Sequence, residues 1–157
     1  IHDNVGSNYR MTEMQAAIGI YQLNNLKKWV KKRNSLSIKI KKVLKNFSYI
    51  RTTELTKNIY HSFYRCYFFI DYKKLNNKYS REDLINLLKK FQIDCNVGSC
   101  PEIYLEKAFK NILNIRRLKN AKVLGETSVA LFINHNFTKN QELSYLNSLK
   151  KALTKLD

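Results

Sequence analysis

The sequence predicts an α+β fold in which a small, mostly antiparallel sheet is faced by helices. Two observations lead to this prediction. From Thr12 to about Phe47, apolar residues recur every three or four positions, which is the period of an amphipathic helix. From Ser48 onward, short strand-like segments alternate with helical ones, without internal repeats or low-complexity linkers. A chain of 157 residues is long enough for one well-packed domain and short for two.

The first predicted helix begins after Thr12, because Thr12 and Gln15 have the spacing of a capping box. Gly19 is its only glycine, and no proline interrupts it. At 1.5 Å per residue the helix would be roughly 50 Å long, which exceeds the diameter of a small domain. We therefore expect it either to bridge two bodies or to bend near residues 33–35. Its apolar stripe would be exposed without a partner, so we expect the isolated chain to self-associate or to be poorly soluble.

Two strands are predicted next, a short one at residues 48–52 and a strongly aromatic one at 60–72. Both alternating faces of 60–72 are largely apolar, so we expect a central strand that is covered on both sides. Ser80 then has the capping signature of a helix over 81–91. Residues 92–97 are predicted to form another strand.

The C-terminal part begins with a loop at residues 98–101 that contains the only proline of the chain. The elements predicted after this loop are a short helix at 102–109, a helix at 118–127, a strand at 129–133 and an amphipathic helix from Thr138 to about Leu156.

The net charge of +17 raises the question of nucleic-acid binding. Lysine is spread over every segment, and neither a zinc-finger spacing nor an RNA-recognition signature is present. We therefore favour a solvated basic surface and expect no nucleic-acid partner. A non-enzymatic basic nucleic-acid-binding module remains the alternative, and it predicts binding to DNA or RNA that weakens steeply with salt.

Three cysteines, Cys66, Cys95 and Cys100, contain no C-x-x-C pair. Metal or redox chemistry is therefore not expected, and a reduced cytoplasmic setting fits. No apolar run approaches the length of a membrane span, so no membrane partner is expected either. Because the chain starts at Ile1 without a Met or a leader, we expect it to be part of a larger protein.

The opening of the chain carries its most informative motif, Asn-Tyr-Arg-Met-Thr-Glu-Met-Gln-Ala-Ala-Ile-Gly at residues 8–19. A polar loop that runs into a helix N-terminus suits an anionic group. With this motif, the chain resembles the DegT/DnrJ/EryC1/StrS family of pyridoxal-phosphate-dependent sugar aminotransferases. Segments in the family's order follow: His-Ser-Phe-Tyr at 61–64, Gly-Ser-Cys-Pro-Glu-Ile-Tyr at 98–104 and Gly-Glu-Thr-Ser at 125–128. The resemblance covers the family's C-terminal portion only.

The resemblance implies the small C-terminal domain of an enzyme of the aspartate-aminotransferase fold type. Residues 1–47 would be a cofactor-proximal loop and an inter-domain helix, and residues 48–157 the small domain. The complete homodimer, with shared active sites, would use pyridoxal 5′-phosphate (PLP). It would transfer an amino group, from glutamate, to a nucleotide-linked keto-deoxysugar for surface polysaccharide or lipopolysaccharide synthesis.

The residues that bind the PLP ring precede the Asn-Tyr-Arg motif in the family, and no lysine here matches the Schiff-base lysine. We therefore assign no catalytic residue, and we expect this chain to be inactive alone. An alternative keeps the fold but acts as a PLP-dependent sugar dehydratase, as members with His at the lysine position do.

By the same resemblance, Asn8 would reach the cofactor phosphate of the neighbouring subunit, although an Asn can also close the turn before the helix. Arg10 would bind the substrate diphosphate or pair with Glu13. Tyr9 would form a wall of the substrate pocket or part of the dimer core.

Three further residues are candidates for substrate contact. His61 lies at the head of the predicted aromatic strand, where it contacts substrate or serves as a structural hydrogen-bonding group. Glu102 and Tyr104 follow a Gly-Ser loop that suits contact with a sugar or uridine, but Tyr104 could equally pack against the short helix.

Overall fold

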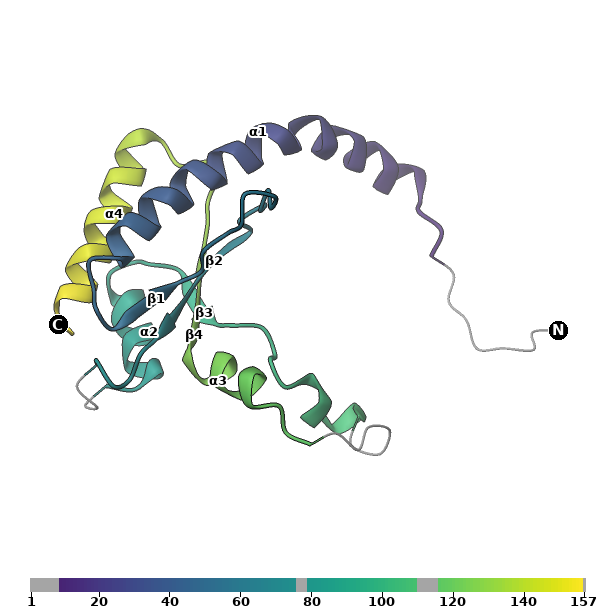
Figure 1. The fold of residues 1–157 in the computed structure, drawn as a ribbon. Coiled ribbons are helices and arrows are strands. Elements are labelled where there is room, and N and C mark those ends of the chain that lie inside the picture. The colour runs from purple at the N-terminus through teal and green to yellow at the C-terminus, as the bar shows by residue number, and fades with distance from the viewer. Residues whose placement is uncertain (1–8, 76–78, 110–115, 157) are drawn as a thin grey trace.

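The computed structural model describes residues 9–75, 79–109 and 116–156. It confirms the α+β prediction, with a small antiparallel sheet and helices on both of its faces (Figure 1). In chain order the elements are α1 (Glu13–Leu44), β1 (Ile50–Thr52), β2 (Arg65–Ile70), α2 (Arg81–Lys90), β3 (Cys95–Val97), the 3-10 turns η1 (Ile103–Leu105) and η2 (Lys107–Phe109), α3 (Lys119–Thr127), β4 (Ser128–Phe132) and α4 (Lys139–Thr154).

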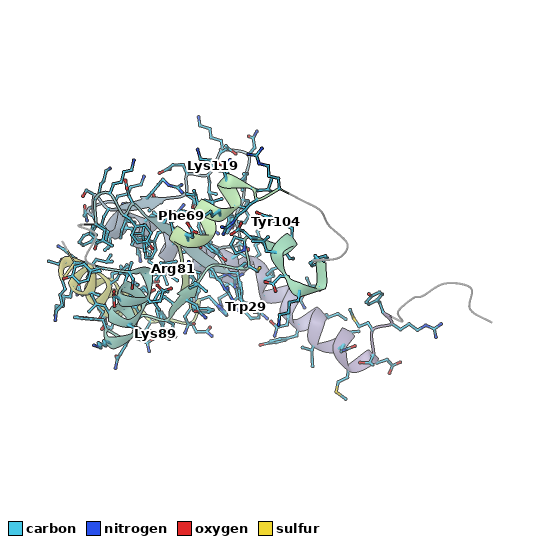
Figure 2. All side chains as sticks on the ribbon, turned by 90° about the horizontal axis from the view of Figure 1, so that it is seen from below. Trp29, Phe69, Arg81, Lys89, Tyr104 and Lys119 are labelled. Carbon is cyan, nitrogen blue, oxygen red and sulfur yellow. The ribbon has the colours of Figure 1, made fainter. Side chains whose placement is uncertain are left out.

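The four strands are ordered β1-β2-β4-β3, and each neighbouring pair is antiparallel. Helices α1, α2 and α4 lie together on one face of the sheet, and α3 lies on the other (Figure 1). Seen from below, Lys119 of α3 and Lys89 of α2 lie on opposite sides of Phe69 of β2 (Figure 2). The two faces of the sheet are therefore covered by different parts of the chain.

The main core lies between the sheet and α1, α2 and α4. In β2, Cys66, Phe68 and Ile70 point into this core, because side chains of a strand alternate between its two faces. A buried hydrogen bond from the Tyr49 hydroxyl to the Leu153 carbonyl, 2.9 Å long, links the chain before β1 to α4. β2 is a central strand, as predicted, and its opposite face is half-buried, so the cover on that side is less complete.

Helix α1 is uninterrupted, and Thr12 caps it with the predicted capping box. Its C-terminal half packs against α4 and the sheet through Leu36, Ile40 and Leu44. Its N-terminal half projects away from the domain (Figure 1), and Met14 is 76% exposed there. The helix is therefore continuous through residues 33–35, and its exposed half extends beyond the domain.

Strand β2 begins at Arg65, five residues later than predicted. Phe63 has a positive φ of 44°, which is incompatible with an extended strand, and it turns the chain just before β2. Consequently, His61 lies in the segment that precedes the strand and is not part of it.

Two other predicted elements also differ. Gln92 has a φ of 60° and ends α2, so β3 starts only at Cys95. The predicted helix at 102–109 consists of two short 3-10 turns. The capping boxes of Ser80 and Thr138, by contrast, start α2 and α4 as predicted.

Candidate functional site

A pocket of about 390 Å³ opens where β2 begins. The strand contributes Arg65 and Tyr67 from its half-buried face, and the loop after β3 contributes Ser99. The segment that precedes β2 completes the lining with His61, Ser62 and Tyr64. The pocket thus combines one positive charge with hydroxyl groups and an imidazole.

Arg65 is held between two aromatic rings. Its guanidinium carbon lies 4.9 Å from the ring centre of Phe132 and 5.5 Å from that of Tyr64. Its Nε is buried and has no hydrogen-bond partner among the described residues. No carboxylate contributes to the described lining of the pocket. A guanidinium in this position is suited to bind an anion, because its planar donors match phosphate and carboxylate oxygens.

Tyr67 and Ser99 join the strand to the loop across the pocket. Their hydroxyl oxygens are 3.1 Å apart, which is a hydrogen-bond distance. The hydrogen bonding of Ser99 lowers the pKa of the Tyr67 hydroxyl despite partial burial, and Arg65 adds to the effect. Both hydroxyls are therefore positioned to serve as polar contacts for a bound molecule.

His61 is fixed by the chain around it. Its Nδ1 accepts a hydrogen bond from the Phe63 amide at 2.9 Å. Its carbonyl accepts one from the Asn34 side chain at 2.8 Å, and the Ser62 carbonyl accepts one from Arg33 Nε at 2.8 Å. The middle of α1 therefore holds this wall of the pocket in place.

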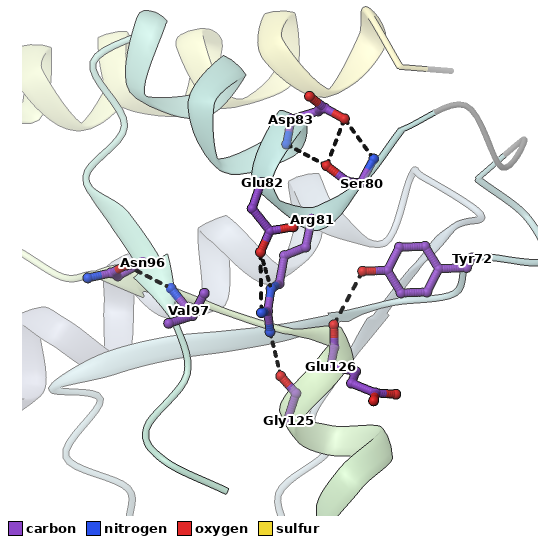
Figure 3. Close-up of polar contacts among 9 residues, drawn as sticks. All are labelled: Tyr72, Ser80, Arg81, Glu82, Asp83, Asn96, Val97, Gly125 and Glu126. Carbon is purple, nitrogen blue, oxygen red and sulfur yellow. Dashed lines mark hydrogen bonds and ion pairs between the residues drawn. The ribbon is translucent and has the colours of Figure 1, made fainter.

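The loop that carries Ser99 rests on α3. The ring of Pro101 packs against the Cα of Gly125, so closely that a Cβ there would overlap the ring. The carbonyl of Gly125 accepts a hydrogen bond from Arg81, and that of Glu126 accepts one from the Tyr72 hydroxyl at 3.2 Å (Figure 3). These side chains satisfy carbonyls in the last turn of α3 and fix its end beneath the loop.

Glu102 and Tyr104 belong to a separate network. The Glu102 carboxylate accepts hydrogen bonds from the Tyr104 hydroxyl at 2.9 Å and from Arg117 at 2.8 and 2.7 Å. The Tyr104 hydroxyl in turn accepts a bond from the Leu118 amide at 2.9 Å. Arg117 is the main reason that the pKa of Glu102 falls to about 2. Neither residue contributes to the described lining of the pocket.

The remaining predicted site residues lie at the other end of α1. Tyr9 is 92% exposed, and Arg10 is exposed beside it. The structure does not bring either of them to the pocket with His61. Asn8, the predicted cofactor-phosphate ligand, lies outside the described residues.

Comparison with models of known protein families identifies the family of this chain. The family model described as "DegT/DnrJ/EryC1/StrS aminotransferase family" matches residues 1–149. The chain belongs to this family. The DegT/DnrJ/EryC1/StrS resemblance of the opening motif is thereby confirmed, and PLP is the cofactor of the aminotransferases in this family.

Solved structures show the same fold. An aminotransferase from Psychrobacter cryohalolentis is 28% identical, with a TM-score of 0.86 over 99% of this chain and 42% of that chain. Helicobacter pylori PseC, an aminotransferase involved in the biosynthesis of pseudoaminic acid, is 20% identical, with a TM-score of 0.79 over 98% of this chain and 40% of its own. The uncharacterized protein MJ1066 of Methanocaldococcus jannaschii is 25% identical over 95% of this chain and 38% of its own. The chain thus spans about two fifths of the length of these relatives.

The pocket at the start of β2 lacks the groups that hold the PLP ring. The cofactor requires a lysine for its aldehyde and a carboxylate for its pyridinium nitrogen. The described lining of the pocket contains neither. Among the described residues there is also no cluster of ligands for a metal ion and no helix with the length and hydropathy of a membrane span. The charged group that the described lining of this pocket does contain is the Arg65 guanidinium, which suits an anion.

Sequence reasoning missed Arg65, Tyr67 and Ser99 as pocket residues. One signal was present in the sequence: Arg65 is the only residue of the DEKR group between positions 58 and 70. A charge inside an aromatic strand indicates a specific partner, because burying it otherwise is costly. The pairing of Tyr67 with Ser99, 32 positions apart, had no comparable signal.

Replacing Gly125 by Ala should destabilise the protein. Alanine gains about 1 kcal/mol of helix propensity over glycine, but its Cβ would overlap the Pro101 ring, and overpacking costs about 1–3 kcal/mol. Gly19→Ala is the matched control, because a Cβ at that helical position meets no atom within 4 Å. We expect urea unfolding to show a loss of stability for Gly125→Ala and a gain for Gly19→Ala. A gain of equal size in both variants would contradict the close contact.

Replacing Arg117 by Met should raise the pKa of Glu102 from about 2 toward the ordinary 4.5. The lowered pKa contributes stability above pH 4.5 that is lost as the pH falls toward 2, and the variant should lack this dependence. The measurement is a carboxyl ¹³C NMR titration of Glu102. Tyr104→Phe should raise the pKa less, because Tyr104 contributes less than Arg117. An unchanged Glu102 titration in Arg117→Met would rule out the ion pair.

Proposed function

We propose that this chain is part of a PLP-dependent aminotransferase that aminates a nucleotide-linked keto-deoxysugar. The amino donor is glutamate, and the product enters surface polysaccharide or lipopolysaccharide synthesis in the cytoplasm. The observation that carries the proposal is the family match over residues 1–149. The solved relatives with the same fold include PseC, an aminotransferase of pseudoaminic acid biosynthesis.

Within this function, the pocket at the start of β2 binds the diphosphate of the nucleotide sugar. Arg65 lines the pocket and supplies its positive charge, and a guanidinium can form paired hydrogen bonds with phosphate oxygens. Tyr67, Ser99 and His61 line the same space and offer hydrogen bonds to the sugar hydroxyls. Glu102 and Tyr104 support the adjacent loop through their own network, in addition to the substrate contact proposed for them.

The complete protein acts as a homodimer with shared active sites. The N-terminal half of α1 supports this proposal, because it presents Met14, Ile18 and Tyr21 to solvent at helical spacing. A second subunit that covers this stripe would also receive Asn8, Tyr9 and Arg10 near its own cofactor and substrate. The residues that bind the PLP ring come from the part of the enzyme that precedes the Asn-Tyr-Arg motif.

Replacing Arg65 by Met should raise the KM for the nucleotide-linked ketosugar by about 10- to 100-fold, the size expected for lost charge-assisted hydrogen bonds. The KM for glutamate should stay unchanged, which distinguishes the diphosphate from a carboxylate as the ligand. Arg51→Met is the matched control, since Arg51 also stacks on an aromatic ring, 4.3 Å from the centre of Phe69, outside this pocket. An increase in the glutamate KM alone would overturn the assignment.

Replacing Asn8 by Ala in the complete enzyme should weaken retention of PLP without dissociating the dimer, because one neutral donor to the phosphate is lost. Absorbance of bound PLP after dialysis measures the retention, and sedimentation velocity measures the assembly. Tyr60→Phe, a change at an exposed residue away from the motif, should retain PLP like the unmodified enzyme. Equal retention in Asn8→Ala would refute the cofactor role.

A further inference from the structure

A second depression lies on the helical face, between the C-terminal turn of α2 and helix α4. It consists of two adjoining hollows of about 650 and 170 Å³ that share Phe91 as a wall. We call this pair of hollows the α2–α4 groove. The larger hollow has the volume of a typical small-molecule site. It shares no lining residue with the pocket at the start of β2.

The larger hollow combines an aromatic ring with a cluster of positive charges. Its lining consists of Phe91, Asn147, Lys150, Lys151, Thr154 and Lys155. The Nζ of Lys155 lies 5.3 Å from the ring centre of Phe91, so the ring and the charges face the same space. No carboxylate occurs in the described lining of either hollow.

The lysines of this region have no acidic partner among the described residues. None of the ion pairs between described residues involves Lys150, Lys151 or Lys155, nor Lys89 and Lys90 at the end of α2. Lysines favour helix C-termini, but each terminus carries only about half a negative charge. Two helix ends therefore offset about one of these five positive charges, and a net positive potential remains at the groove.

The backbone at the end of α2 fixes the position of Phe91. The Phe91 amide bonds to carbonyls in the last turn, and the Ile93 amide bonds to the Leu88 carbonyl at 3.0 Å. Gln92, with its positive φ, turns the chain between them. The smaller hollow continues past Phe91 with polar side chains, among them Gln141, Ser144 and Ser148. These can hydrogen-bond to the edge of a planar ring that stacks on Phe91.

We propose that the α2–α4 groove binds a nucleoside polyphosphate as an effector, separate from the substrate. The base stacks on Phe91 with its edge toward the smaller hollow and displaces the Lys155 ammonium from the ring face. Lys155 then binds the phosphates together with Lys150 and Lys151. A compact hollow with an aromatic wall favours this ligand over a nucleic-acid strand, for which an extended basic stripe would be needed. The site lies on the face of the domain opposite to α3 (Figure 2).

The test is isothermal titration of the full chain with ATP, tripolyphosphate and adenosine at about 0.15 M salt. ATP should bind more tightly than tripolyphosphate, and adenosine should bind most weakly. The double variant Lys151→Met/Lys155→Met should weaken ATP binding by about tenfold or more, since it removes two phosphate contacts. Phe91→Leu should weaken ATP binding but leave tripolyphosphate binding unchanged.

Two control variants test whether ATP binds at the groove itself. Lys27→Met/Lys31→Met removes the same charge from α1, far from the groove, and Arg65→Met alters the substrate pocket. Both should leave ATP binding within about twofold, a difference of less than 0.5 kcal/mol. An equal loss in the α1 control would show diffuse charge attraction and overturn the site. Loss of ATP binding in Arg65→Met alone would assign the nucleotide to the substrate pocket, and absence of ATP binding would also refute the proposal.

Discussion

The burial of one face of the sheet beneath α1, α2 and α4 determines where the functional side chains can lie. Because Cys66, Phe68 and Ile70 must point into the core, the alternation of β2 sends Arg65, Tyr67 and Phe69 to the opposite face. A shift of the strand by one residue would bury a guanidinium in the apolar core. The same constraint that stabilises the domain therefore places a positive charge where a ligand can reach it.

The second wall of the pocket depends on contacts that are distant in the sequence. The loop with Ser99 is supported from below by Gly125, whose missing side chain leaves room for Pro101. Gly125 itself is fixed by Arg81 at the start of α2 (Figure 3). On the other side, α1 holds the segment around His61 through Arg33 and Asn34. Three helices thus position a pocket to which none of them contributes a lining residue.

The sequence predicted the local features of this fold and missed those that depend on tertiary contacts. Thr12, Ser80 and Thr138 identified the helix starts, because a capping box needs only residues three positions apart. The opening motif identified the family. The late start of β2 was missed, since the positive φ of Phe63 has no signature in a run of β-forming residues. The Glu102–Arg117 pair was missed because its members meet only after the intervening chain turns back.

The unbroken course of α1 has a mechanical consequence. From Val30, where burial begins, to Glu13 the helix extends about 25 Å beyond the domain, at 1.5 Å per residue. Its C-terminal half packs against α4, so a rotation of that half is transmitted along the continuous helix to its N-terminal end. A rotation of the C-terminal half by about 5° displaces the N-terminal end by about 2 Å, enough to break a hydrogen bond there. Small reorientations of the domain are therefore amplified at Tyr9 and Arg10.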